Sequence, residues 1–422
     1  MNRKKSLVVF GILAVLYVVI GLWTRTDEPK SYRAKDAQII LYGEQHGIKE
    51  FYEYEFKEWQ RFYEEEGMRD LFLELPYYTA EFLNLWMQEE DDAILDEMYA
   101  DTEGTASHTQ DYLDFFRKIK ESCPETVFHG TDVGHQFEIT GARYLAYLEE
   151  KGLTDSEKYE LALANMEQGK EWYEKQDPID WDWREEKMIE NFLETYERIG
   201  RGKIMGIYGG AHVDVKDGKI MAGAIKDKYG DVVSGIYIFT EILKERTYRI
   251  GFSHIGMLFL MMLFIPNMIW AKHQPKDYEN YVKNENEVLL LFEKTGEVLV
   301  TLLAFIFPAL NPVFYAAPYG MIFPARIYYL VLACVCMLLY EGYWIRYFKS
   351  EKTMKDMYRD FVGVPLAGAT LPVMAFALLA VYSQNLLLLI AVAVLGVGHI
   401  GIHYQHFKEV WEDAGTSESI EI

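Results

Sequence analysis

The stretch Gln38–Gly47, with the sequence QIILYGEQHG, decides the fold. It opens with a short apolar run rich in β-forming residues, which is typical of a buried strand. The run stops at Gly43, and a long segment with a helical pattern follows Gly47. Glu44 and His46 are therefore expected at the C-terminal end of a strand, where open α/β sheets bind ligands. The alternative is an ordinary strand-to-helix turn with two solvated side chains.

Further short apolar runs alternate with helical patterns along the next two hundred residues. The runs are Arg69–Pro76, Thr126–Val133, Lys203–Tyr208 and Val232–Phe239. This alternation predicts an α/β fold with a largely parallel central sheet and flanking helices. Glu74, Asp132 and His212 lie at or just after the ends of three of these runs. Because parallel strands end at one edge of a sheet, these side chains are expected to converge with Glu44 and His46.

Other polar residues near these strand ends are candidates for substrate contacts. Arg184, Met188 and Asn191 fall on one face of a predicted helix, which suggests a face turned toward a polar pocket. A surface helix is the alternative for this segment. For Glu74 the alternative is a salt bridge to an arginine, since a buried carboxylate must be paired.

The sequence also predicts a membrane region. Ser6–Trp23 is an uncharged run after three basic residues, and it is predicted to be an uncleaved signal anchor rather than a cleaved signal peptide. Five more apolar runs lie near residues 251–270, 297–317, 326–347, 361–382 and 385–403, and each approaches the length that crosses a bilayer. Together they predict an all-α transmembrane bundle, with about six spans including the anchor.

The charges of the loops predict the orientation of these spans. Basic residues lie almost entirely in the loops on the side of the N-terminus, whereas the short loops on the other side contain only Arg326. The expected organisation is a multi-pass protein of the cell membrane with a signal anchor at residues 1–23, an extracytoplasmic α/β domain at 24–249, a bundle of about five helices at 250–404 and a cytoplasmic tail at 405–422.

Charge and cysteine content limit the possible functions. Residues 24–249 contain 28 Lys and Arg against 50 Asp and Glu, so almost all of the net charge of −23 lies in this domain. Such a domain is not expected to bind nucleic acid. Cys123, Cys334 and Cys336 suit neither a disulfide framework nor a cysteine-based zinc site. The histidines near the end of the last span, His399, His403 and His406, are interpreted as interfacial and are left outside the site.

Two motifs resemble those of a known superfamily. Gly43-x-x-His46 and Gly209-x-x-His212, with Glu74 between them, resemble the paired Gly-x-x-His motif of the Tiki and TraB/GumN proteins. The opening Gly-Glu-x-His also resembles the erythromycin esterases and the ChaN iron-regulated lipoproteins. Segments 130–132 and 184–191 resemble the esterase branch. The resemblance covers roughly residues 37–240, and the six-span membrane region departs from it.

The resemblance implies a hydrolase in some branches, either a metal-dependent peptidase or an esterase with a histidine base. It implies the catalytic residues His46, Glu74, His212 and Glu44, of which His46, His212 and Glu74 could bind Zn, Mn or Co. Without a metal, His46 could act as the general base. The candidate substrate contacts are Asp132, His135, Arg184, Asn191 and Tyr208. The substrate is expected to be a small molecule or a peptide.

Two alternatives come from other functional classes. The first is a ChaN-like module for haem or iron, which Tyr42 and Tyr208 beside the site would suit. The second is a membrane regulator whose inactive domain binds a peptide signal.

Overall fold

The computed structural model describes residues 29–174, 180–282, 285–317, 320–322 and 324–418. The chain divides into two compact units. The α/β unit comprises residues 29–242 together with Tyr315–Ile322, and the helical unit comprises Leu243–Phe314 and the chain after Phe323.

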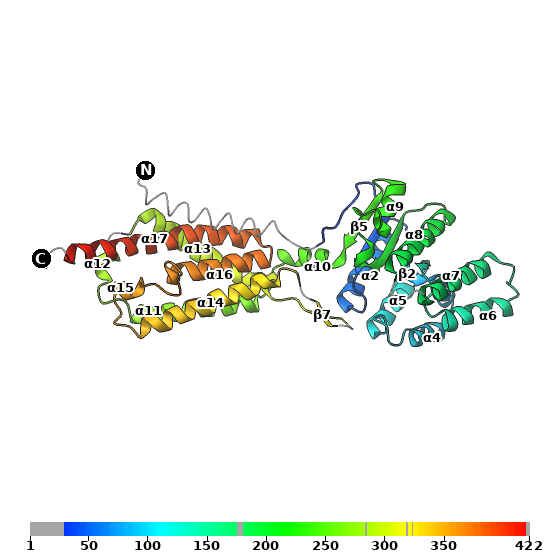
Figure 1. Ribbon diagram of the computed structural model, residues 1–422, viewed down its shortest axis with the longest axis horizontal. Coiled ribbons are helices and arrows are strands. Elements are labelled where there is room, and N and C mark those ends of the chain that lie inside the picture. Colours follow the sequence, from blue (N-terminus) through cyan, green and yellow to red (C-terminus); the bar gives the residue numbers. More distant parts are fainter. Residues whose placement is uncertain (1–28, 175–179, 283–284, 318–319, 323, 419–422) are drawn as a thin grey trace. The chain divides into compact units, whose positions relative to one another are not determined.

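The α/β unit is built on a parallel sheet, as the sequence predicts (Figure 1). Within the described residues this sheet has five strands in the order β3-β2-β4-β1-β5. Their bounds are β1 (Ile39–Glu44), β2 (Asp70–Pro76), β3 (Val127–Asp132), β4 (Ile204–Gly209) and β5 (Val233–Tyr237). β1 and β4 are neighbours in register, so that Gly43 pairs with Tyr208 and Glu44 with Gly209. The two Gly-x-x-His motifs therefore leave the sheet side by side.

Helices cover both faces of this sheet because alternate side chains of each strand point to opposite faces. Ile39 and Leu41 pack with Met188 and Phe192 of α8, whereas Tyr42 packs against Phe62 of α2 on the other face. The helices of the unit are α2 (Lys49–Glu65), α3 (Tyr77–Trp86), α4 (Ala93–Asp101), α5 (Gln110–Ser122), α6 (Ala142–Glu150), α7 (Glu157–Glu174), α8 (Trp181–Arg198) and α9 (Met221–Tyr229), with a π-helical turn η1 (Phe137–Gly141) and a 3₁₀ turn η2 (Gly210–His212).

Glycine is required where the two motifs meet. A Cβ atom on Gly43 would lie 2.4 Å from the side chain of Val213 and 3.0 Å from the Cα atom of Gly210. Gly47 has a φ of 81°, a left-handed conformation that other residues adopt only with strain. These glycines let the loop after β1 turn tightly against the loop after β4.

A short hairpin from the second half of the chain belongs to the α/β unit. It consists of β6 (Tyr315–Ala317) and β7 (Gly320–Ile322), which are antiparallel. The Tyr315 ring packs against Phe51 of α2 and against Phe239, with ring centroids 5.6 and 5.7 Å apart. This hairpin lies in the stretch that the sequence assigns to the membrane bundle.

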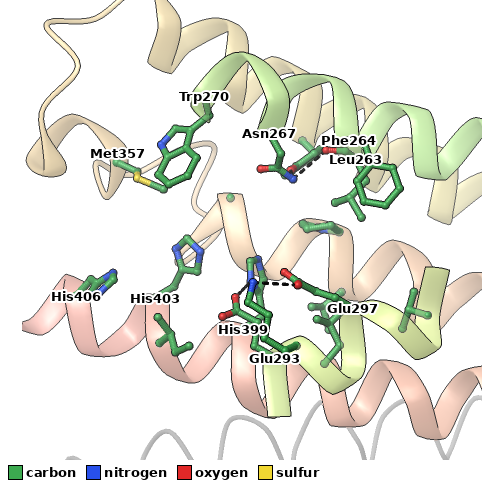
Figure 2. Close-up of a pocket in the computed structure, with 18 of the residues that line it drawn as sticks. Leu263, Phe264, Asn267, Trp270, Glu293, Glu297, Met357, His399, His403 and His406 are labelled. Atoms are coloured by element: carbon green, nitrogen blue, oxygen red, sulfur yellow. Dashed lines mark hydrogen bonds and ion pairs between the residues drawn. The ribbon is translucent and has the colours of Figure 1, made fainter. Parts of the chain in front are cut away.

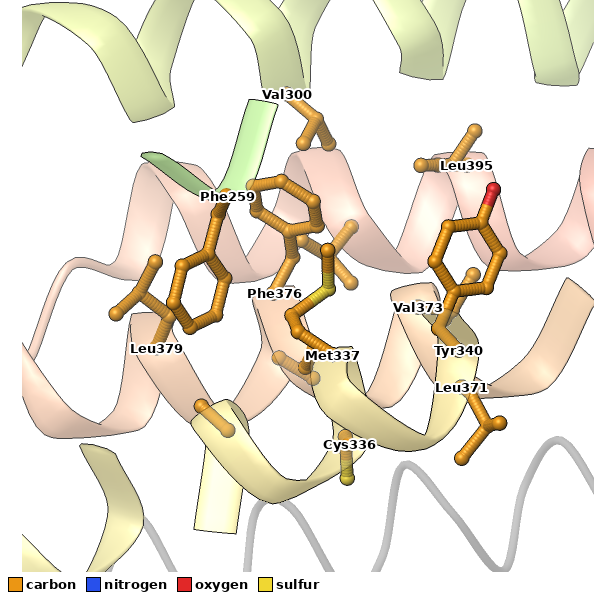
Figure 3. Close-up of a cluster of buried hydrophobic side chains, with 14 of the residues drawn as sticks. Phe259, Val300, Cys336, Met337, Tyr340, Leu371, Val373, Phe376, Leu379 and Leu395 are labelled. Carbon is orange, nitrogen blue, oxygen red and sulfur yellow. The ribbon is translucent and has the colours of Figure 1, made fainter. Parts of the chain in front are cut away.

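The helical unit is a bundle of long apolar helices (Figure 1). After α10 (Ile238–Thr247), which crosses the boundary between the units, its elements are α11 (His254–Lys272), α12 (Glu279–Val282), α13 (Glu287–Ile306), η3 (Pro308–Leu310), α14 (Ile327–Phe348), α15 (Met354–Met357), α16 (Ala367–Tyr382) and α17 (Leu386–Glu418). Phe259 of α11, Met337 of α14 and Phe376 of α16 meet in its interior (Figure 3).

The helices of this bundle match the predicted spans only in part. Among the described residues, three helices are long and apolar enough to cross a membrane, namely His254–Lys272, Ile327–Phe348 and Leu386–Trp411, and Ala367–Tyr382 is apolar but shorter. The predicted anchor at 6–23 lies outside the described residues. The total of about six spans therefore stays a prediction.

The predicted span at 297–317 is misplaced. α13 ends at Ile306, nine residues after the predicted start, and the chain becomes extended at Phe307. Pro308 explains this end, because proline disfavours helical geometry in the residue before it and cannot donate a backbone hydrogen bond. α13 instead begins at Glu287 and carries charged residues that the prediction placed outside the span.

Candidate functional site

The loop after β1 places a histidine against a carboxylate. His46 Nδ1 lies 2.7 Å from Glu44 Oε1, and the two side chains are 38 and 8% exposed. Burial lowers the pKa of His46, but the charge and hydrogen bond of Glu44 outweigh it and raise the pKa to about 9. The contact at Nδ1 orients the ring, and Nε2 lies 3.9 Å from Glu74 Oε2, beyond hydrogen-bond distance, where it can act on a ligand. His46 is therefore an imidazole oriented by a carboxylate, just after the C-terminal end of β1.

Glu74 lies at the centre of the site. Its Oε1 accepts a hydrogen bond from the Arg184 Nη2 at 2.7 Å, and its Oε2 accepts one from the backbone N–H of Gly209 at 2.5 Å. The Nε2 atoms of His212 and His46 lie 3.5 and 3.9 Å from its two oxygens. Burial raises the pKa of Glu74, but the hydrogen bond from His212 and the surrounding positive charges hold it well below its usual range. Glu74 is therefore a buried anion that holds cations around it.

His212 is fixed by a carboxylate on its other side. Its Nδ1 lies 2.5 Å from Oε2 of Glu185 on α8, and the other oxygen of Glu185 accepts the backbone N–H of Met221 at 2.6 Å. Burial lowers the pKa of His212, but its hydrogen bonds to Glu185 and Glu74 raise the pKa to about 10. His212 is therefore protonated at neutral pH and contributes positive charge to the site.

Arg184 joins Glu74 to the end of β3. Its guanidinium donates to both oxygens of Asp132, at 3.1 and 2.6 Å, in addition to Glu74. Burial raises the pKa of Asp132, but Arg184 and His135 outweigh it and lower the pKa to about 2. His135 Nε2 lies 3.1 Å from Asp132, and its Nδ1 lies 3.0 Å from the Tyr173 hydroxyl. The bidentate pair between Arg184 and Asp132 is strong because guanidinium and carboxylate match in shape and charge.

No protein-family model matches the sequence, and no curated protein matches it. Three solved structures are similar to it in fold. An erythromycin esterase mutant in its open conformation has a TM-score of 0.36 and 13% identity, over 48% of this chain and 69% of that one. A Bacillus cereus protein and a succinoglycan biosynthesis protein each have a TM-score of 0.34 and 14% identity, over 53 and 52% of this chain and 73% of theirs. At these values the likeness assigns neither a family nor an activity.

Some residues expected to touch substrate lie deeper than the sequence suggests. Tyr208 is fully buried, and its hydroxyl is 2.7 Å from the Thr131 hydroxyl. The Asn191 side chain donates to the backbone carbonyls of Thr131 and Asp132 and to Gln168. Both side chains therefore hold the C-terminal end of β3: Tyr208 does so from within the core and Asn191, which is partly exposed, from α8. Tyrosine and asparagine side chains can take these places because they form hydrogen bonds with hydroxyl groups and backbone carbonyls of the protein interior.

The tyrosines that would suit haem are also engaged. Tyr42 is fully buried, and its hydroxyl donates to Glu58 at 2.8 Å. Tyr208 is buried as described above. Neither hydroxyl is presented to a ligand in this structure, so the arrangement gives no support to the haem alternative.

Two glutamates of the site escaped the sequence analysis. Glu185 holds His212, and Glu55 of α2 lies against Glu44 with only 1% of its surface exposed. Neither oxygen of Glu55 and one oxygen of Glu44 have a hydrogen-bond partner among the described residues. Burial and the nearby charge of Glu44 raise the pKa of Glu55 well above its usual range. One sign of the buried Glu55 was present in the sequence. It lies four residues from both Phe51 and Trp59, so a glutamate interrupts an otherwise aromatic face of the predicted helix.

The expected metal ligands do not form a ligand set in this geometry. Among the described residues, no group of three or more His, Cys, Asp or Glu side chains is arranged to hold a metal ion. His46, Glu74 and His212 have suitable donor atoms, but both oxygens of Glu74 already accept hydrogen bonds from Arg184 and Gly209. A divalent metal at these residues stays a prediction, and no chemical step is derived through it.

Proposed function

We propose that this chain is a membrane-associated hydrolase in which His46, oriented by Glu44, activates water to cleave a peptide, ester or amide bond. The observation that carries the proposal is the 2.7 Å contact between His46 Nδ1 and Glu44, with the histidine the most exposed member of the cluster. In its neutral form His46 takes a proton from water through Nε2 as the water attacks the carbonyl carbon.

The neighbouring cations would stabilise the negative charge that develops on the carbonyl oxygen. His212 is protonated, and Arg184 is held by Glu74 and Asp132. Groups that are already oriented by buried partners stabilise a transition state without reorganising. When the intermediate collapses, the proton on His46 passes to the leaving group. Glu74 and Asp132 act in this scheme by positioning the cations.

Hydrolysis by the purified full chain tests the proposal. With p-nitrophenyl acetate and a peptide p-nitroanilide as probes, we expect release of p-nitrophenol or p-nitroaniline that persists after treatment with EDTA. Activity that EDTA removes and Zn²⁺, Mn²⁺ or Co²⁺ restores would replace this mechanism with the metal-assisted one. A chain that cleaves neither probe, nor a wider panel of esters and peptides, would contradict the hydrolase proposal.

The proposed location of the site is the outer side of the membrane, which the distribution of basic residues in the sequence supports. A chain in which the three native cysteines are replaced, with Ser156→Cys added, should react with a membrane-impermeant maleimide in intact cells. The matched control is Ser350→Cys, which lies in a loop predicted to be cytoplasmic and should react only after permeabilisation. The reverse pattern would place the site in the cytosol.

A further inference from the structure

The helical unit contains a partly open cavity that the proposed reaction does not use. It has a volume of about 530 Å³ and is lined by residues of α11, α13, α14, α15, α16 and α17 and of the loops next to α12 and α15. This size lies in the range of small-molecule sites. Figure 2 shows Trp270 and Asn267 projecting from α11 toward His399 and His403 of α17. The three histidines near the end of the last predicted span, His399, His403 and His406, therefore line a cavity.

Aromatic rings form much of the wall. Trp270 and Tyr278 pack at 84° with centroids 5.3 Å apart, and Tyr340 and Trp344 pack at 88° with centroids 6.1 Å apart. All four of these rings line the cavity. The face of an aromatic ring attracts cations, and quaternary ammonium groups are bound in this way.

The charges of the lining also favour a cation. Three carboxylates line the cavity, Glu285, Glu293 and Glu297, against one lysine, Lys294. The Lys294 side chain is 66% exposed and is paired with Glu297 at 3.2 Å. The Glu293 side chain is only 12% exposed and contacts Nδ1 of His399 at 2.6 Å, and Glu285 lies 3.4 Å from Nε2 of His406. With the three histidines of the lining counted as neutral, its formal charge is negative.

An unpartnered donor gives a second, independent sign of a ligand. The indole nitrogen of Trp270, which lines the cavity, is buried and has no hydrogen-bond acceptor within the part of the chain that the structure describes. Buried donors are normally paired, so this one calls for an oxygen acceptor inside the cavity.

We propose that this cavity binds an organic ammonium compound that also carries an oxygen acceptor, of the kind found in choline. The ammonium group would lie between the aromatic faces and Glu293, and the oxygen would accept from an indole N–H. Such a group occurs both in free amino alcohols and in the headgroups of phospholipids. The proposal stands independently of the hydrolase chemistry, because all of the lining residues belong to the helical unit.

Binding of radiolabelled choline to the purified full chain in detergent, measured by equilibrium dialysis, tests this. The matched neutral probe is 3,3-dimethyl-1-butanol, which has the shape and hydroxyl of choline without its charge. We expect saturable choline binding, competition by the neutral probe at least about tenfold weaker, and a loss of at least about tenfold in affinity for Glu293→Gln. Glu351→Gln is the control, since this residue is 88% exposed and does not line the cavity.

The two sources are separated by dihexanoylphosphatidylcholine below its micellar concentration. Displacement of choline by this lipid assigns the site to a headgroup, and its failure to displace choline assigns the site to a free amine. Absence of saturable choline binding, or equal competition by the neutral analogue, would overturn the proposal. Trp270→Phe keeps an aromatic ring and removes the donor, and it should weaken choline binding less than Glu293→Gln does. Size-exclusion elution profiles identical to that of the native chain exclude misfolding of the variants.

Discussion

Replacement of His46 by glutamine is expected to lower turnover of an ester probe by roughly 10²–10⁴-fold, the range for loss of a positioned general base. Glutamine preserves a polar side chain near Glu44 but cannot accept the proton. The fold should survive, because His46 lies on a loop and is 38% exposed.

The pH profile gives the sharper test of this role. The pKa of His46 is raised to about 9, so at lower pH most of the enzyme carries the protonated, inactive base. The activity of the native chain should therefore rise about tenfold per pH unit up to about pH 9 and level off above it. The residual activity of the His46→Gln variant should not show this rise with pH.

A control variant lies next to the pair. Glu55→Gln keeps a neutral donor facing Glu44, as the protonated Glu55 does, and should retain most of the activity and the same rise with pH. Native turnover in the His46→Gln variant, with the same rise of activity with pH, would remove His46 from the mechanism. The hydrogen bonds around Glu74 would then have a structural role.

The largest effect on stability is expected for Arg184→Met. The substitution keeps a long side chain but leaves Glu74 and Asp132, which are 9 and 2% exposed, without their shared cation. Breaking a buried pair in this way costs about 3–5 kcal/mol, because the two carboxylates lose their closest cation and keep only the longer contacts with His212 and His135. Arg33→Met is the matched control: Arg33 is 53% exposed and pairs with Glu241, so its loss should cost less than about 1 kcal/mol.

Unfolding of the α/β unit can be followed in the intact chain through Cys123. This thiol is fully buried in that unit, and it becomes reactive only when the unit opens. With Cys334 and Cys336 replaced, the urea concentration at which Cys123 is labelled should fall strongly for Arg184→Met and little for Arg33→Met. Equal labelling curves for the two variants would show that Arg184 does not neutralise buried charge.

Much of the α/β architecture can be read from the sequence because it depends on local patterns. Strands β1 to β5 are short apolar runs, and their alternation with helices fixes a parallel sheet. The convergence of His46, Glu74 and His212 follows from the same rule, since each lies at the same edge of that sheet. The apolar helices α11, α14 and α17 are likewise set by composition over about twenty residues.

Tertiary structure alone decided which partner each polar group takes. Arg184 meets Glu74, 110 residues away, and no local pattern distinguishes this bond from an exposed arginine. Glu55 and Glu185 are ordinary helix residues until the fold buries them against Glu44 and His212. α13 shows the same limit: its charged residues obscured the helix in the hydropathy pattern. The burial of Glu293 depends on its contact with His399, which lies in a helix more than a hundred residues further along the chain.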